Sequence, residues 1–228
     1  MSRRAGIVVF PGSNCDRDCR QALESLGAET TFVWHTETSL PDVDFVVLLG
    51  GFAHGDYLRT GAIARFSPVM RAVTAYAEVG GIVIGICNGW QVLCEAGLLP
   101  GALRKNSGLK FICRWVDARV ENDRPPFTSR ARVGQRLRIP INHFEGSWYC
   151  DPDDLDRIRA NGQVLLRYTD NPNGALDDVA GVTNERGNVF GLMPHPERAC
   201  DPSSGSQDGA VILGSMLDSV SVREHAHL

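Results

Sequence analysis

The sequence predicts a doubly wound α/β fold, with a mostly parallel sheet, helices on both faces and an antiparallel extension at one edge. Short β-rich runs alternate with segments of helical period between residues 6 and 96. The runs 44–49 and 82–86 are apolar on both faces, as buried parallel strands are. Between residues 111 and 168 strand-like runs follow one another without clear helices, which favours antiparallel pairing. The 228 residues suit a single domain, 1–228.

In the amino-terminal half, the sequence predicts strands that alternate with turns and helices. The expected elements are strand 6–10, turn 11–14, helix 16–26, strands 29–34 and 44–49, a glycine-rich loop 50–56, a largely helical segment 62–79, strand 82–86 and helix 88–96. Gly27 and Gly97 end the first and last of these helices. Pro68 must kink the segment 62–79 or start a fresh helix, because proline lacks the N–H that a helix interior needs.

The carboxyl-terminal half predicts further strands and one last helix. Strands are expected at 111–120, 136–141 and 163–168, a hairpin of strands 179–184 and 188–193, and a final helix at 208–220. The turn of the hairpin is expected at Glu185-Arg186-Gly187, where a glycine favours chain reversal.

Composition and charge exclude several classes of protein. A net charge of −4 and a pI near 5.9 give no electrostatic footprint for nucleic acid or an anionic membrane. The apolar runs are too short to span a bilayer, and residues 7–10 are too short for a secretory signal, so we expect a cytoplasmic, soluble protein. The seven cysteines are scattered without a C-x-x-C pair, which predicts neither a disulfide framework nor a metal site.

A candidate nucleophile lies in Gly85-Ile86-Cys87-Asn88-Gly89, between a predicted buried strand and a predicted helix. This G-x-nucleophile-x-G form is typical of a nucleophile elbow, in which glycines let a strained turn pass close to its neighbours. The turn would place the sulfur at a helix N-terminus, where aligned peptide dipoles favour the thiolate. The backbone N–H of Asn88 would point to where an oxyanion forms.

A candidate base follows the last predicted strand, in Pro194-His195-Pro196-Glu197. The flanking prolines favour an extended backbone, so the side chains of His195 and Glu197 should leave the chain on one side. His195 would accept the thiol proton, and Glu197 would fix the imidazole tautomer. Alone, the segment equally fits a solvated turn; with Cys87 it predicts a catalytic triad.

Five segments resemble class I (triad) glutamine amidotransferases. Residues 85–91 and 194–197 are similar to the two signature segments of that family. Residues 9–16, 50–64 and 188–198 resemble one branch of it, the glutaminase subunits of phosphoribosylformylglycinamidine synthases, which act in purine biosynthesis. The resemblance runs through nearly the whole chain. It implies a flavodoxin-like fold and the hydrolysis of L-glutamine to glutamate and ammonia.

The resemblance also implies roles for individual residues. Cys87 would form the glutamyl thioester, with His195 as general base and acid and Glu197 as its orienter. The backbone N–H groups of Gly51 (or Phe52) and Asn88 would form the oxyanion hole. The α-amino and α-carboxylate groups of glutamine would be held by Gln91 and by the loop Asn142-His143-Phe144-Glu145.

The partners implied are L-glutamine and a large synthetase subunit, with a small accessory subunit left open. No cofactor is expected in this chain; ATP and Mg²⁺ are expected on the synthetase, because the sequence has no phosphate-binding glycine motif. Arg59, Arg65 and Arg71 either dock that subunit or form an ordinary solvated face.

Three other functions stay open at this point. The chain could serve another acceptor, such as an anthranilate or carbamoyl-phosphate system. It could be a stand-alone cysteine hydrolase of similar fold, such as a γ-glutamyl hydrolase or a peptidase. It could also be a non-catalytic binding or redox-sensing module that uses only the thiol.

Overall fold

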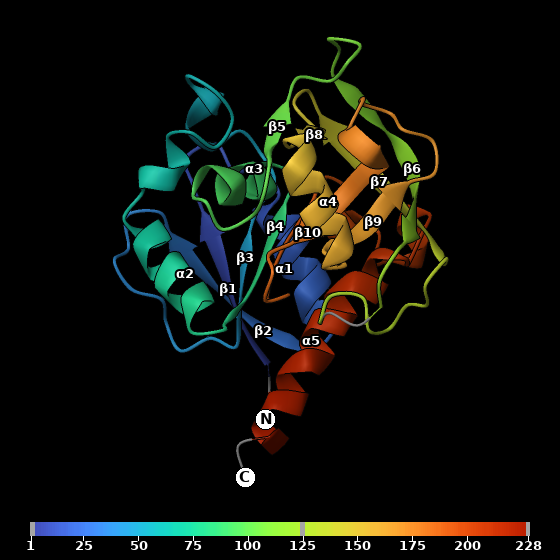
Figure 1. Cartoon of the computed structure of the whole chain (residues 1–228). Helices are drawn as coiled ribbons and strands as arrows, with labels where there is room; N and C mark the ends of the chain where they lie inside the picture. The colour runs from blue at the N-terminus through green and yellow to red at the C-terminus, as the bar shows by residue number, and fades with distance from the viewer. Residues whose placement is uncertain (1–2, 124–125, 227–228) are drawn as a thin grey trace.

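One large sheet forms the centre of the molecule (Figure 1). The computed structural model describes residues 3–123 and 126–226. Within those residues the sheet has nine strands in the order β2-β1-β3-β4-β11-β10-β9-β6-β7. Their bounds are β1 Arg3–Val9, β2 Ala28–Trp34, β3 Phe45–Leu48, β4 Ile82–Ile86, β6 Ile112–Val120, β7 Arg136–His143, β9 Val164–Tyr168, β10 Val179–Thr183 and β11 Val189–Leu192.

The sheet changes from parallel to antiparallel at β11. Strands β2, β1, β3, β4 and β11 pair in parallel, whereas β10, β9, β6 and β7 continue the sheet in antiparallel pairs. Three strands of the parallel half, β3, β4 and β11, are buried along their whole length, because helices cover both faces there. The predicted fold class, including the antiparallel extension, is confirmed.

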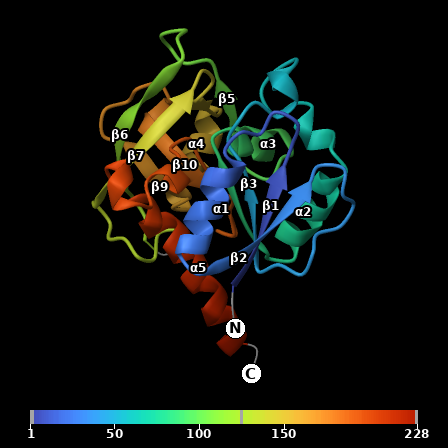
Figure 2. The ribbon, with the colours of Figure 1, turned by 180° about the vertical axis from the view of Figure 1, so that it is seen from behind.

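Helices cover the sheet from both sides. They are α1 Asp16–Ser25, α2 Val69–Glu78, α3 Asn88–Glu95, α4 Pro152–Ala160 and α5 Gly209–Ala226. Helices α2, α3 and α4 lie in front of the sheet in Figure 1, and α1 and α5 lie on the other face, nearest the viewer in Figure 2. In the described part of the chain, none of the helices combines the length and apolar character that a membrane crossing requires.

The structure differs from the expected elements in three places. The stretch 111–168 does contain a helix, α4, which begins at Asp151 and Pro152 and carries acidic residues in its first turn. The segment 62–79 is helical only from Val69, after a short 3-10 turn, Ala64–Phe66; of the two effects expected of Pro68, the start of a fresh helix is confirmed, because Pro68 occupies the N-cap. Two three-residue strands were missed, β5 Ala102–Arg104 and β8 Ser147–Tyr149, which pair with each other outside the main sheet.

The carboxyl ends of four neighbouring parallel strands meet at one edge. Strand β1 leads into residues 10–15, β3 into the loop 50–56, β4 into Cys87 and β11 into residues 193–197. A ligand site in a parallel α/β sheet is expected at this edge, because the loops there converge. The fold therefore brings together segments that are far apart in the sequence.

Close packing holds the turn between β4 and α3 in place. A Cβ on Gly89 would lie 2.2 Å from the carbonyl oxygen of Leu48 on β3, and one on Gly85 would lie 2.7 Å from the backbone of Gly89. Both positions therefore exclude any side chain. The first turn of α3 lies directly on the backbone of β3, which fixes where the helix begins.

We expect Gly89→Ala to lower the free energy of unfolding by about 3 kcal/mol, because backbone atoms cannot move aside as a flexible side chain can. Gly108→Ala is the matched control: its added Cβ would meet no atom within 4 Å. That variant should change stability by less than about 1 kcal/mol. Urea denaturation followed by circular dichroism measures both, and equal stabilities would contradict the packing argument.

Candidate active site

Cys87 lies on a strained turn between β4 and α3. Its backbone has φ 50° and ψ −105°, a conformation that non-glycine residues rarely adopt. The N–H of Cys87 donates to the carbonyl of Leu192 on β11 at 2.8 Å, which ties the turn to the neighbouring strand. The thiol lies 3.7 Å from the carbonyl oxygen of Asn142. The predicted elbow is therefore present.

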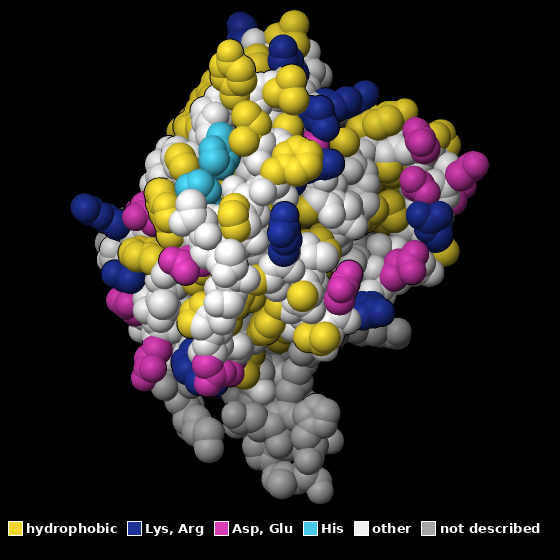
Figure 3. Space-filling view, turned by 90° about the vertical axis from the view of Figure 1, so that its left-hand side faces the viewer, with side chains coloured by type: hydrophobic (Ala, Val, Ile, Leu, Met, Phe, Trp, Pro, Cys, Tyr) yellow, Lys and Arg dark blue, Asp and Glu magenta, His cyan; other side chains and the backbone are white. Residues whose placement is uncertain are grey.

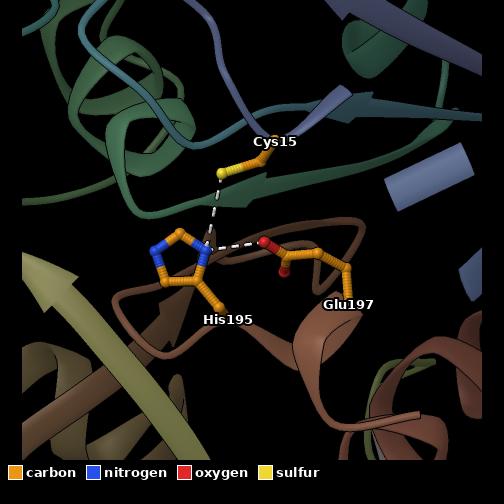
Figure 4. Close-up of side chains that lie close together, drawn as sticks. All are labelled: Cys15, His195 and Glu197. Carbon is orange, nitrogen blue, oxygen red and sulfur yellow. Dashed lines mark hydrogen bonds and ion pairs between the residues drawn. The ribbon is translucent and has the colours of Figure 1, made fainter. Parts of the chain in front are cut away.

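His195 and Glu197 form a buried pair (Figure 4). Nδ1 of His195 lies 2.6 Å from Oε1 of Glu197, and the N–H of His195 donates to the carbonyl of Pro140 at 2.8 Å. The expected extended backbone is wrong here: Pro196–Arg198 form a 3-10 turn, and that turn brings the carboxylate back to the imidazole. The contact itself was correctly predicted.

The second nitrogen of His195 remains available for a proton from Cys87. Nε2 is buried and has no hydrogen-bond partner among the described residues. Burial acts to lower the pKa of His195, but the charges of Glu197 and Cys87 outweigh it and raise that pKa well above its usual range. The imidazolium that forms on accepting a proton is therefore stabilised where it is produced.

Cys15 also contacts this pair, which the sequence did not indicate. Its sulfur lies 4.0 Å from Nδ1 of His195 and 3.3 Å from a guanidinium nitrogen of Arg198. Ligand atoms of Cys15, His195 and Glu197 all lie within 4.8 Å of one another, as in a three-ligand metal site. The 2.6 Å separation of Nδ1 and Oε1 is, however, shorter than two ligands about 2.0–2.2 Å from a zinc ion would adopt in tetrahedral geometry, so a hydrogen bond describes it better.

The glycine loop supplies one candidate oxyanion donor rather than two. The N–H of Phe52 already donates to the carbonyl of Gly12 at 2.9 Å, whereas no acceptor within the described ranges takes the N–H of Gly51. The side chain of Asn88 accepts from the N–H of Ala53 at 3.0 Å, which holds the loop against the start of α3. Of the predicted alternatives, the arrangement favours Gly51 with Asn88.

A pocket of about 190 Å³ opens beside Cys87. This volume is below the 300–1,000 Å³ of drug-sized sites, so it suits a small metabolite. Its walls include every residue that was predicted to contact glutamine; they are Gly51, Phe52, Asp56, Thr60, Cys87, Gln91, Asn142, His143, Phe144 and Glu145. A larger hollow of about 390 Å³ lies between α1 and residues 197–204, but Cys87 does not line it.

Comparison with known proteins identifies the family. The CobB/CobQ-like glutamine amidotransferase domain matches residues 2–210. The chain belongs to this glutamine amidotransferase family. It is 54% identical to phosphoribosylformylglycinamidine synthase subunit PurQ of Salinibacter ruber, over 97% of this chain and 99% of that one. It is 55% identical to the PurQ subunit of Rubrobacter xylanophilus, over 94% of this chain and 97% of that one.

A solved structure gives the same assignment. The structure of PurLQS from Thermotoga maritima contains a chain that superposes on this amidotransferase with a TM-score of 0.90 and 46% identity, covering 96% of this chain and all of that one. The match extends through both the parallel and the antiparallel halves of the sheet. The fold and the class I (triad) amidotransferase assignment therefore agree.

Two carboxylates line the pocket of the amidotransferase: Glu145, in the loop expected to hold glutamine, and Asp56, which was not predicted as a contact. Glu145 accepts from the hydroxyl of Thr60 at 3.0 Å, and Asp56 accepts from the side-chain amide of Asn88 at 3.2 Å. Burial and the charge of Glu145 raise the pKa of Asp56 to about 6. Two acidic groups held together at partial burial indicate a site for a cation.

His143 forms a neutral part of the pocket wall. Burial and the neighbouring His195 lower its pKa to about 3, so its imidazole is uncharged at neutral pH. Its Nδ1 lies 3.1 Å from Oδ1 of the buried Asn106. The predicted roles of Gln91, Asn142 and Phe144 in holding glutamine stay predictions, although all three line the pocket.

We expect a glutamine-analogue diazoketone to alkylate Cys87 alone. Cys113 is exposed but lies outside the pocket, and burial raises the pKa of Cys150 to about 11 and of Cys200 to about 12, so those thiols stay protonated. Peptide mass spectrometry locates the adduct, and added L-glutamine should slow its formation. An adduct on Cys113 would remove the support for the pocket as the substrate site.

Proposed function

We propose that this chain is the glutaminase subunit of a phosphoribosylformylglycinamidine synthase. It hydrolyses L-glutamine and passes the ammonia to a large ATP-dependent synthetase subunit. That subunit converts formylglycinamide ribonucleotide to formylglycinamidine ribonucleotide in purine biosynthesis. The observation that carries the hydrolase chemistry is Cys87 on its strained turn, above a small pocket and beside the His195–Glu197 pair. High identity to PurQ subunits along nearly the whole chain supports this acceptor.

The first half of the reaction uses Cys87 and His195. Nε2 of His195 takes the thiol proton, and the sulfur attacks the amide carbon of glutamine. The oxyanion that forms accepts hydrogen bonds from the N–H groups of Gly51 and Asn88. His195 then gives its proton to the amide nitrogen, the carbon–nitrogen bond breaks, and ammonia leaves a glutamyl thioester on Cys87.

The second half regenerates the thiol. Water enters after the ammonia has left, and His195 removes a proton from it as it attacks the thioester carbon. Collapse of the second tetrahedral intermediate expels the Cys87 thiolate, which takes that proton back from His195, and releases glutamate. Glu197 keeps the proton on Nδ1 throughout, so that Nε2 faces the sulfur in the correct tautomer.

The pocket recognises glutamine by charge and by shape. Asp56 and Glu145 pair with the α-ammonium group, since they are the two carboxylates among the lining residues. Gln91 donates from Nε2 to the carbonyl of Glu145 and so fixes the loop that carries this carboxylate. Asn142, His143 and Phe144 complete the wall beside the sulfur.

The acceptor subunit completes the reaction. Ammonia released into bulk water at neutral pH is protonated and loses its nucleophilicity, so the hydrolase is useful only when an acceptor site receives its product directly. ATP and Mg²⁺ act on the synthetase, and the reaction takes place in the cytoplasm. The chain contributes the glutamine site and the nucleophile.

Reconstitution with the cognate synthetase subunit tests this function. With ATP, Mg²⁺ and formylglycinamide ribonucleotide, we expect glutamine to support product formation only when both subunits are present. Cys87→Ser should abolish the glutamine-dependent reaction but leave the reaction with added ammonium salt intact. Glu197→Gln should lower the glutamine-dependent rate at least about 10²-fold. Productive coupling to an anthranilate or carbamoyl-phosphate synthetase subunit instead would refute the acceptor.

The KM for glutamine should rise as the pH falls through about 6, because protonation of Asp56 removes a charge partner of the α-ammonium group. In Asp56→Asn the KM should be about tenfold higher at pH 7.5 and should not change between pH 5 and 8. Initial rates across that range, in the wild type and the variant, measure both effects. A wild-type KM that is constant through pH 6 would argue against the carboxylate role.

The same substitution that weakens glutamine binding, Asp56→Asn, should stabilise the fold at neutral pH. The pKa of Asp56 is higher in the folded chain than its ordinary value of 3.8, so the ionised carboxylate destabilises the fold above pH 6. Asp56→Asn should therefore be more stable than the wild type at pH 7.5, by about 1 kcal/mol after allowing for screening by solvent. The advantage should disappear as the pH approaches 4.

A further inference from the structure

One segment near the pocket carries basic residues and no acidic ones. Residues 96–116 contain no acidic residue but four basic ones, Arg104, Lys105, Lys110 and Arg114, in a chain whose net charge is −4. Lys105 and Lys110 are also the only lysines in the sequence. Both lie in the connection between β5 and β6, and neither has an ion-pair partner in the part of the chain that the structure describes. Arg114 pairs with Asp170, whereas the positive charge of the two lysines has no such partner among the described residues.

This connection, residues 105–111, is an exposed loop that we call the basic loop. Leu109 is 68% exposed with φ 50°, and Phe111 is 47% exposed. Apolar side chains held in solvent, one of them on a strained backbone, suggest a surface that another molecule covers. The loop forms the apex of Figure 1, and in Figure 3 the apex combines basic with hydrophobic side chains.

One residue of the basic loop is buried and joins it to the pocket. Asn106 is fully buried, and its side-chain amide donates to the carbonyl of Lys110 at 2.9 Å and to that of His143 at 3.0 Å. Its side-chain oxygen accepts from the N–H of Gly146 at 3.1 Å. Its own N–H donates to the carbonyl of Phe144 at 2.9 Å. A displacement of the basic loop must therefore move the pocket wall 142–146, because the same side chain holds both.

The opposite lip of the pocket exposes further apolar residues. Tyr57 and Leu58, which lie between the pocket residues Asp56 and Thr60, are 77% and 82% exposed. The arginines of this lip that were candidates for docking have other partners: Arg59 and Arg65 both pair with Glu95. A protein interface commonly has an apolar centre and a charged rim. The two lips together offer this arrangement, with the charged side at the basic loop.

We propose that the basic loop docks an acidic surface of the acceptor subunit, and that Asn106 transmits this docking to the wall of the glutamine pocket. The proposal rests on the function proposed above. An acceptor that receives ammonia directly must sit over the pocket, and the basic loop lies at its lip. Docking then fixes residues 142–146 in the arrangement that binds glutamine. Without an acceptor, glutamine hydrolysis stays slow, because residues 142–146 are not fixed in that arrangement.

The docking step is tested with the double variant Lys105→Glu/Lys110→Glu and the purified synthetase subunit. Basal glutaminase activity of the variant alone should stay within about twofold of the wild type, whereas the synthetase concentration that gives half-maximal stimulation should rise at least about tenfold. Wild-type stimulation should also weaken with added salt. Stimulation of the double variant at wild-type synthetase concentrations would overturn the proposal.

Arg132→Glu is the matched control. Arg132 is exposed in the connection between β6 and β7, near the Arg119–Arg136 end of that strand pair, whereas His143 and the basic loop lie at the Ile112 end. The two ends are roughly 23 Å apart at the rise of a β-strand. This charge reversal should leave stimulation unchanged, and an equal loss in the control would show that only overall charge matters and would overturn the proposal.

The transmitting role of Asn106 is tested separately. Asn106→Ala should bind the synthetase as the wild type does in sedimentation experiments, but its KM for glutamine should stay at the unstimulated value while kcat changes less. Asn106→Asp, which keeps the acceptor oxygen, should recover part of the stimulation. Equal losses of basal and stimulated activity, or full stimulation of Asn106→Ala, would overturn the link.

The controls separate this proposal from the proposed function. If the wild-type chain neither binds the synthetase nor is stimulated by it, the proposed function fails. If the wild type is stimulated and the lysine variant is stimulated equally, the function stands and the basic loop is not the docking site.

Discussion

The strained turn at Cys87 is the constraint on which the rest of the site depends. The sulfur can reach a substrate only because the backbone reverses within one residue, at φ 50°, between a buried strand and a helix. Such a backbone costs on the order of 1–3 kcal/mol and persists only where its surroundings over-determine it. Here Gly89 lies against the backbone of β3 and Leu192 of β11 accepts the N–H of Cys87. Contacts with the sheet therefore hold the backbone of Cys87 in its strained conformation.

The loops around the turn are joined to one another by buried side chains rather than by the sheet. Asn88 holds the glycine loop, Gln91 holds the loop that carries Glu145, and Asn106 holds the same loop from the other side. Each of these amides both donates and accepts. Because this network joins the loops of the pocket, a displacement of one loop at the lip can move the residues near the sulfur of Cys87.

Much of this arrangement could be predicted because its signals are local. The elbow is recognisable from two glycines around Cys87 after an apolar run, and the parallel strands from their apolar faces. The pairing of His195 with Glu197 was predicted correctly but for the wrong reason: the prolines suggested an extended chain, whereas Pro196 begins a tight turn. A proline fixes φ near −65°, which both conformations allow.

The remaining features could not be predicted because they depend on contacts between distant segments. Cys15, Asp56 and Thr60 reach the site through loops whose course depends on packing, and a lone carboxylate or thiol in a loop has no sequence signal of its own. Helix α4 is different, since the sequence does carry signals for its start, with Asp151 at the N-cap and Pro152 as the first residue. Helix α4 is short and lies between strand-like runs, so its helical period is weak in the sequence.

The position of β11 has a consequence for the newly made chain. This strand fills the gap between β4 and β10, and it leads directly into His195. A chain still emerging from the ribosome carries its reactive sulfur long before it carries the base, and its sheet is split in two until that strand inserts. Ammonia release must therefore wait until β11 and His195 have been translated and that strand has inserted.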